Sequence, residues 1–190
     1  MKTSTRRSVL GACILLAAAG GAYAYWLSLV PATHPDHDHG ILNLDAGGRI
    51  LVTTRDGKSR NLVGRPGKPL VLHFTSPEAP GAVEELAKLF DAERKLRSLG
   101  DAEILVVTKA KDFHAVDAWL AAQKLEPPRP NEIVLDPSGD TTTKLNCKRP
   151  IETMVFTAEG KLSAQSRGPL EWGTDLPGLL EKARGGVTLE

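Results

Sequence analysis

Short apolar runs alternate along this chain with longer stretches in which apolar residues recur every three or four positions. Residues 70–74 and 102–108 are nearly continuous apolar runs, typical of strands that are buried on both faces. Each is followed by a stretch with helical spacing, the first reaching about Leu99 and the second running from Asp112 to Leu125. This order predicts a β-α-β-α unit with two parallel strands joined by right-handed crossovers.

Further strand-like runs lie on both sides of this unit. Residues 49–54 and 59–63 flank an Asp-Gly turn at 55–58, which predicts a β-hairpin at the start of the domain. After the proline-rich break at 127–130, the predicted elements are short strands at 132–135, 153–157 and 161–165 and a last helix at about 175–183. The predicted fold class is therefore α/β, with a central mixed sheet flanked by helices.

The first predicted helix has a clear start signal. Ser76 is a good N-cap residue, Pro77 suits the first helical position, and Glu78 places an acid where the helix dipole favours it. We therefore expect the helix to begin here. Its charged residues, Glu84 and Glu85 among them, are expected largely on the solvent side.

The N-terminal residues differ in character from the rest. Residues 9–30 contain no charged side chain and follow basic residues at 2, 6 and 7, so they predict a bilayer-spanning anchor whose amino end stays in the cytoplasm. Residues 1–30 are accordingly assigned as a signal-anchor or transmembrane helix of the bacterial inner membrane, with the domain in the periplasm or outside. An alternative is export and cleavage after Ala24, because residues 22–24 fit a small-x-small site and residues 5–10 resemble a twin-arginine signal.

Residues 31–46 read as a linker, and residues 47–190 as one domain of ordinary size. The linker carries His34, His37 and His39 interleaved with aspartates, a tract that could bind copper or zinc, although a flexible segment binds metal only loosely. No other cofactor is indicated. The formal net charge of +1 gives no electrostatic footprint for nucleic acid, so the bilayer and a membrane or periplasmic protein are the expected partners.

The order of these predicted strands and helices, together with several short motifs, resembles the thioredoxin superfamily over about residues 47–185. The similarity is to its membrane-attached TlpA/ResA branch in particular. The similar stretches are Asp-Gly-Lys at 56–58, Gly-Lys-Pro and the following strand at 67–74, Asp-Pro-Ser-Gly at 136–139, Ile-Glu-Thr-Met-Val-Phe at 151–156, Gly-Lys at 160–161 and Gly-Pro-Leu-Glu-Trp at 168–172. The resemblance implies a thioredoxin-like fold and, for an intact member, thiol-disulfide exchange.

That family carries Trp-Cys-x-Pro-Cys at the start of its first helix, followed by a glutamate. Here the matching stretch runs from Pro77 to Gly81, with Pro80 at the motif proline and Glu84 at the glutamate. The resemblance therefore puts Glu78 and Gly81 at the two thiol positions, with Ala79 between them. Exchange needs one thiolate to attack and a second thiol to resolve the mixed disulfide, so this alignment leaves no redox dithiol.

The resemblance also implies a cis-proline in a loop opposite the dithiol. That position falls on Ile151, or on Pro150 after a one-residue shift. A binding groove is expected between the two segments, lined by Pro77, Glu78, Pro80, Pro150 and Ile151.

One cysteine lies beyond the N-terminal segment, at position 147. A single thiol in an oxidising compartment cannot close an intramolecular disulfide. Cys147 either packs as a small buried residue or acts as an exposed thiol whose pKa is lowered by Lys148 and Arg149. His73 and His114 are read as packed or surface histidines, and Trp119 as a core residue.

Three functional hypotheses follow. The first is a tethered partner-binding or complex-assembly protein without redox catalysis. Under this hypothesis the chain is not a thiol-disulfide oxidoreductase. The second is a thiol-disulfide oxidoreductase-related protein that works through Cys147. The third is a periplasmic copper- or zinc-binding protein that uses the tract from His34 to His39.

Overall fold

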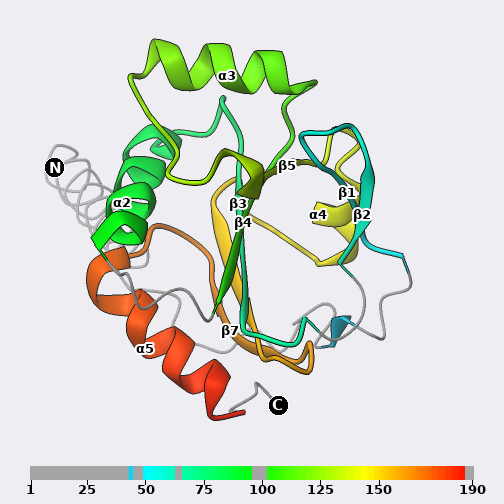
Figure 1. The fold of residues 1–190 in the computed structure, drawn as a ribbon, viewed down its shortest axis with the longest axis vertical. Helices are drawn as coiled ribbons and strands as arrows, with labels where there is room; N and C mark the ends of the chain where they lie inside the picture. The colour runs from blue at the N-terminus through cyan, green and yellow to red at the C-terminus, as the bar shows by residue number, and fades with distance from the viewer. Residues whose placement is uncertain (1–42, 45–48, 63–65, 96–101, 187–190) are drawn as a thin grey trace, which may run out of the picture. The chain divides into compact units, whose positions relative to one another are not determined.

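The computed structural model describes residues 43–44, 49–62, 66–95 and 102–186. In this part of the chain the strands are β1 (Leu51–Thr53), β2 (Ser59–Asn61), β3 (Leu70–Thr75), β4 (Glu103–Thr108), β5 (Ile133–Leu135), β6 (Glu152–Phe156) and β7 (Leu162–Ser166). The helices are α2 (Ala82–Lys95), α3 (Phe113–Ala122), the 3-10 turn η3 (Pro130–Glu132), α4 (Asp140–Lys144) and α5 (Trp172–Arg184). The strands form one mixed sheet in the order β2-β1-β5-β4-β3-β6-β7 (Figure 1).

The centre of the sheet is parallel. β3 pairs with β4 in parallel from Leu70 opposite Glu103 to Thr75 opposite Thr108, and β4 pairs in parallel with β5. This confirms the predicted β-α-β-α unit. β6 runs antiparallel to β3 and to β7, so the second half of the domain is a hairpin added to the β3 side of the sheet.

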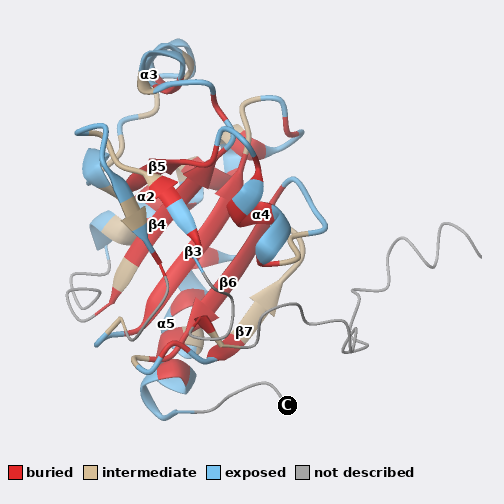
Figure 2. Cartoon of the chain, turned by 90° about the vertical axis from the view of Figure 1, so that its right-hand side faces the viewer, coloured by how far each residue is buried: buried red, intermediate tan, exposed pale blue. Residues whose placement is uncertain are grey.

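Two apolar clusters cover the two faces of the sheet (Figure 2). On one face, β-strand residues such as Val71 and Val106 pack with residues of α2, α3 and α5. On the other face, Leu72 and Val107 pack with Ile50, Val52 and Leu145. Every residue of β3 is buried, which explains why its sequence lacks a polar alternation.

The turn between β1 and β2 shows why Asp-Gly stands there. The two strands pair antiparallel, and Gly57 adopts a left-handed backbone with φ 78°. A glycine adopts this conformation at no steric cost. The Asp56 carboxylate accepts a hydrogen bond from the Thr54 hydroxyl at 2.6 Å and forms an ion pair with Lys58 at 2.7 Å. These two interactions close the turn.

Helix α2 begins at Ala82, several residues later than the start predicted at Ser76. Residues 77–81 form turns instead, because Gly81 has φ 81°, a left-handed conformation that a right-handed helix cannot contain. The sequence signals at Ser76 and Pro77 therefore mark a turn that leads into the helix. The first helical hydrogen bond here runs from the Glu85 amide to the Gly81 carbonyl at 3.0 Å.

The short helix α4 was not predicted, because its Asp-Thr-Thr-Thr-Lys sequence has low helix propensity. A buried carboxylate holds it in place. Asp136 accepts hydrogen bonds from the amides of Thr141 at 3.2 Å and Thr142 at 2.8 Å, and from the Thr142 hydroxyl at 2.7 Å. The Asp-Pro-Ser-Gly turn thus caps the helix that follows it.

Among the described residues, no helix combines the length and apolar character needed to cross a membrane. The predicted anchor at residues 9–30 lies outside the described residues, as do the cleavage site after Ala24 and linker residues 31–42.

Candidate functional site

Two loops meet at one end of the sheet, one following β3 and one preceding β6. Because β6 is the antiparallel neighbour of β3, Phe74 near the end of β3 lies opposite Glu152 at the start of β6. The loop of residues 76–81 therefore lies beside the loop of residues 147–151. A Cβ atom added at Gly81 would lie 3.9 Å from Cδ1 of Ile151, which measures how closely the loops approach.

A small apolar cluster joins the two loops. Ala79, Ala82 and Ile151 form it, with exposed fractions of 9%, 1% and 6%, and Trp119 of α3 packs against it. We call these four residues the loop cluster. Trp119 also packs against the main core, as expected from its helical spacing, but its contact with the loops was not foreseen.

Glu78 is exposed and is not part of the loop cluster. Its carboxylate accepts a hydrogen bond from the Ser76 hydroxyl at 2.6 Å, and its amide donates to the Ser76 oxygen at 3.3 Å. The Ser76 hydroxyl lowers the pKa of Glu78 below its usual value. Glu78 is therefore a fixed surface anion, with its backbone held in the turn.

The remaining predicted groove residues form the surface around this cluster. Pro77 is half-buried, and Pro80, Gly81 and Pro150 are exposed. Ile151 is buried beneath them. The structure therefore places the two segments expected to line the groove beside each other, with Ile151 of one segment packed against Ala79 and Ala82 of the other.

A buried glutamate fixes the loop before β6. One carboxylate oxygen of Glu152, a residue with no exposed surface, accepts the amides of Lys148 at 2.8 Å and Arg149 at 3.1 Å. The other oxygen accepts a hydrogen bond from the Gln165 side chain. None of the described residues has a cis peptide bond, so neither Pro150 nor Ile151 is cis in this structure.

Cys147 is the first residue of this loop, and it is half-buried against the apolar cluster that contains Ile50, Val52 and Leu145. Burial raises the pKa of its thiol, and the charge of Glu152 raises it further. The hypothesis of a reactive thiol needs a pKa shift in the opposite direction. The structure thus agrees with the alternative interpretation, in which Cys147 packs as a small apolar side chain.

Glu85 is buried, contrary to the expectation that it faces solvent. One of its carboxylate oxygens accepts the indole Nε1–H of Trp172 at 2.7 Å and the Leu170 amide at 2.9 Å. Burial raises the pKa of Glu85. The sequence pattern did not predict this burial, because Glu84 and Glu85 are adjacent residues of the same type. The structure shows Glu84 exposed and Glu85 buried.

His73 in β3 is also fully buried, which agrees with its interpretation as a packed histidine. Its Nδ1 lies 3.0 Å from the Thr153 hydroxyl, and its ring stands edge-on to Trp172 at 5.2 Å. Its Nε2 has no hydrogen-bond partner among the described residues. Burial lowers its pKa to about 3, so the ring is neutral at physiological pH.

The residues considered as metal ligands are not grouped in the structure. Within residues 43–44, 49–62, 66–95 and 102–186, no set of three His, Cys, Asp or Glu side chains could hold a metal ion. His114 is exposed on α3. His34, His37 and His39 lie outside the described residues.

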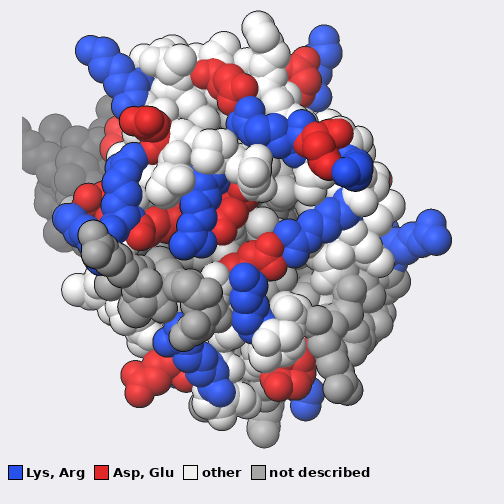
Figure 3. Space-filling model, in the orientation of Figure 1, with Lys and Arg blue, Asp and Glu red and all other residues white. Residues whose placement is uncertain are grey.

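Basic and acidic side chains are intermixed on the face drawn in Figure 3, and no large patch of one sign covers it.

The sequence matches no protein-family model and no curated protein. Many solved structures nevertheless share its fold. A thiol:disulfide interchange protein of the DsbE type from Chlorobium tepidum superposes with a TM-score of 0.60 at 16% identity, covering 77% of this chain and 97% of that one. StoA from Bacillus subtilis gives a TM-score of 0.56 at 18% identity, with coverages of 74% and 99%.

A third similar structure is the exposed lipoprotein thioredoxin of Streptococcus pneumoniae, with a TM-score of 0.53, 23% identity and coverages of 70% and 99%. These likenesses establish a thioredoxin-like α/β fold with a mixed central sheet flanked by helices. Two of these structures are described as a thiol:disulfide interchange protein and a thioredoxin, and the fold implied by the resemblance in sequence is confirmed.

Proposed function

We propose that this protein is a membrane-tethered, extracytoplasmic partner-binding protein that uses a thioredoxin-like fold without dithiol exchange. The observation that carries the proposal is the loop cluster: where the loops after β3 and before β6 meet, the packed side chains are Ala79, Ala82 and Ile151. None of them contains sulfur. Neither cysteine of the chain, at 13 or 147, is in a Cys-x-x-Cys pair.

The packing supports dithiol-equivalent positions one residue later than those of the sequence alignment. Ala79 and Ala82 have the required spacing, face Ile151, and are joined by a hydrogen bond from the Ala82 amide to the Ala79 carbonyl at 3.1 Å. Glu78 is exposed, and Gly81 is left-handed. We therefore assign the dithiol-equivalent positions to Ala79 and Ala82.

The glutamate that follows the motif supports this shift. Moving the alignment by one residue replaces the exposed Glu84 with the buried, hydrogen-bonded Glu85. Pro80 then falls one position earlier than the motif proline, which is the one departure that the shift introduces. Burial and hydrogen bonding weigh more than a proline on an exposed turn, because they fix the helix against the core.

The surface around the loop cluster is suited to a protein partner. Exposed Pro80 and Pro150 lie on two rigid loops, and rigid loops lose little conformational entropy when they bind. Glu78 supplies a negative charge on one loop, and Lys148 and Arg149 supply positive charges on the other. Opposite charges on the two sides of one site orient a partner and exclude wrongly charged ones.

The location of this function is inferred from the N-terminal segment. Residues 9–30 have the length and flanking charges of an anchor that leaves the domain outside the cytoplasm. Among the similar structures, one is described as a secreted disulfide oxidoreductase of Mycobacterium tuberculosis and another as an exposed lipoprotein.

The test uses the full chain in its native membranes. Crosslinking followed by affinity capture should recover a specific membrane or extracytoplasmic protein, and Cys147→Ser should recover it equally well. The double variant Lys148→Glu/Arg149→Glu should lose it, whereas Lys111→Glu, an exposed lysine after β4, should not. Disulfide-linked capture that disappears in Cys147→Ser would contradict the proposal and favour a thiol function.

A further inference from the structure

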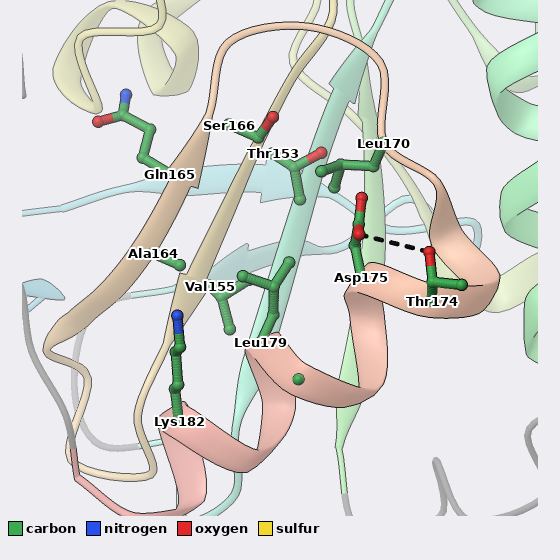
Figure 4. A pocket seen from close by; sticks show the side chains of 11 residues that line it. Thr153, Val155, Ala164, Gln165, Ser166, Leu170, Thr174, Asp175, Leu179 and Lys182 are labelled. Carbon is green, nitrogen blue, oxygen red and sulfur yellow. Dashed lines mark hydrogen bonds between the residues drawn. The ribbon is translucent and has the colours of Figure 1, made fainter. Parts of the chain in front are cut away.

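A cavity of about 340 Å³ lies between strands β6 and β7 and helix α5, and its lining begins at Thr153, two residues after Ile151 of the loop cluster (Figure 4). This volume is at the lower end of the range of small-molecule sites. Its apolar wall includes Val155, Ala164 and Leu179. Hydroxyl groups of Thr153, Ser166 and Thr174 also line it.

Two opposite charges of α5 line the same cavity. Asp175 lies in the first turn of the helix and Lys182 near its end, and both side chains are directed toward the sheet (Figure 4). Seven residues separate them, which is about 10.5 Å along a helix. A lysine side chain leans toward the helix N-terminus, which shortens the gap between the two charged groups.

Neither charge is neutralised by its surroundings in the described part of the chain. The Asp175 carboxylate accepts the Glu171 amide at 3.0 Å and a longer bond from the Thr174 hydroxyl at 3.4 Å, and no cationic group pairs with it. Lys182 makes no hydrogen bond or ion pair with a described residue, and Leu179 and Gly178 separate it from Asp175 along the cavity wall.

We propose that this cavity binds a free, zwitterionic peptide of two or three residues, with its amino group at Asp175 and its carboxylate at Lys182. An extended peptide spans about 3.3–3.6 Å per residue, so two or three residues fit the distance between the charges. Small apolar side chains would contact Val155 and Ala164. The Ser166 hydroxyl can donate to or accept from a peptide group between the termini. The Thr153 hydroxyl is bonded to His73 and the Thr174 hydroxyl donates to the Glu171 carbonyl, so these two offer acceptor lone pairs.

Gly178 gives the cavity its depth. A Cβ atom added there meets no heavy atom within 4 Å, and its backbone is not left-handed, so a larger side chain would extend into free space. Gly178→Leu should therefore fill the cavity without strain, and it also raises helix propensity. Gly173 in the same helix is the matched control, since its added Cβ also meets nothing and it does not line the cavity.

The experiment titrates trialanine into the isotope-labelled full chain and follows backbone amide shifts. Wild-type protein should bind with a Kd of about 1 mM or tighter. N-acetyl-trialanine and trialanine amide should each bind about five- to tenfold more weakly. Gly178→Leu should lose binding, and Gly173→Leu should retain it.

A charge swap gives a readout that altered folding would not reproduce. Lys182→Glu should reverse the preference, so that trialanine amide binds more tightly than trialanine. Glu181→Gln, which changes an exposed carboxylate of α5 outside the cavity, should leave the preference as it is. Absence of shift changes in β6, β7 and α5 at 10 mM trialanine, taken as roughly tenfold above the expected Kd, would overturn the proposal. Equal binding of N-acetyl-trialanine amide, which is blocked at both ends, would overturn it as well.

Discussion

The indole Nε1–H of Trp172 donates a 2.7 Å hydrogen bond to the carboxylate of Glu85, and both residues are buried. Trp172 begins α5 and Glu85 lies in α2, so this bond joins the first and last helices that cover the same face of the sheet. The same carboxylate oxygen also accepts the Leu170 amide. Glu85 therefore fixes where the chain enters α5.

Replacing Glu85 with leucine should be clearly destabilising. The substitution leaves a buried indole N–H and a backbone amide without an acceptor, which costs about 1–3 kcal/mol for each group that water cannot reach. Urea unfolding followed by Trp fluorescence measures the change in the free energy of unfolding.

Glu85→Gln is the matched variant for this prediction. Its amide oxygen can still accept one of these bonds, and it carries no charge that burial disfavours, so its loss should be less than half of the loss for Glu85→Leu. Equal losses for the two variants would contradict the prediction, because they would show that the hydrogen bonds of Glu85 do not account for the loss.

His73 should make the protein less stable as the pH falls from about 6.5 to about 3. The pKa of the folded-state imidazole is lowered to about 3 from 6.5, so over this range the unfolded chain binds a proton that the folded chain does not. The slope contributed by one such group is at most about 1.4 kcal/mol per pH unit. Unfolding free energies measured across this range for wild type and His73→Leu test it, and an unchanged slope in the variant would contradict it.

Glu93 should make the protein less stable as the pH rises, which is the opposite of the pH dependence expected from His73. Burial and the nearby Glu132 carboxylate raise its folded-state pKa to about 8 from 4.5, so the folded chain retains a proton that the unfolded chain releases. Its contribution to stability is complete below about pH 4.5 and is lost as the pH rises to about 8. Glu93→Gln should remove this decline, whereas Glu84→Gln, an exposed glutamate of the same helix, should keep it.

Cys147 should react slowly with alkylating reagents. Its raised pKa reduces the thiolate fraction tenfold per unit, and burial hinders access, so alkylation at pH 8 should be at least about 100-fold slower than that of a peptide thiol. In urea the rate should rise to that of the peptide. A fast reaction of the folded protein would favour the thiol hypothesis.

A cysteine pair introduced at positions 79 and 82 should form a disulfide. The turn closed by the Ala82 amide and the Ala79 carbonyl keeps the two Cα atoms within about 7 Å, near the range of about 4.4–6.8 Å that disulfides need. Cysteines at 78 and 81 should form one less readily, because a side chain at Gly81 must adopt φ 81°. Thiol counts after mild oxidation, in a Cys147→Ser background, compare the two pairs, and a preference for 78 and 81 would restore the original alignment.

Much of the fold could be predicted from the sequence because its strands are buried on both faces. Continuous apolar runs such as β3 and β4 have few alternative structures, and the Asp-Gly turn at 56–57 has a specific backbone requirement. Helix α4 could not be predicted, because it depends on the capping carboxylate of Asp136 and not on its own residues.

The sequence predicts the two segments of the candidate site, but it does not determine the register within the first segment. Pro80 and the acids at 84 and 85 support two alignments one residue apart, and sequence alone does not distinguish an exposed glutamate from a buried one. The left-handed Gly81 and the packing of Ala79 and Ala82 against Ile151 distinguish them. Both depend on contacts between segments about 70 residues apart.

The loop before β6 is fixed through its backbone, since Glu152 accepts the amides of Lys148 and Arg149. Any residue except proline can supply such an amide. Positions 148 and 149 can therefore change in charge and size while the loop keeps its shape. Substitution at these two positions therefore gives relatives of this protein a route to new partners that keeps the backbone of the loop.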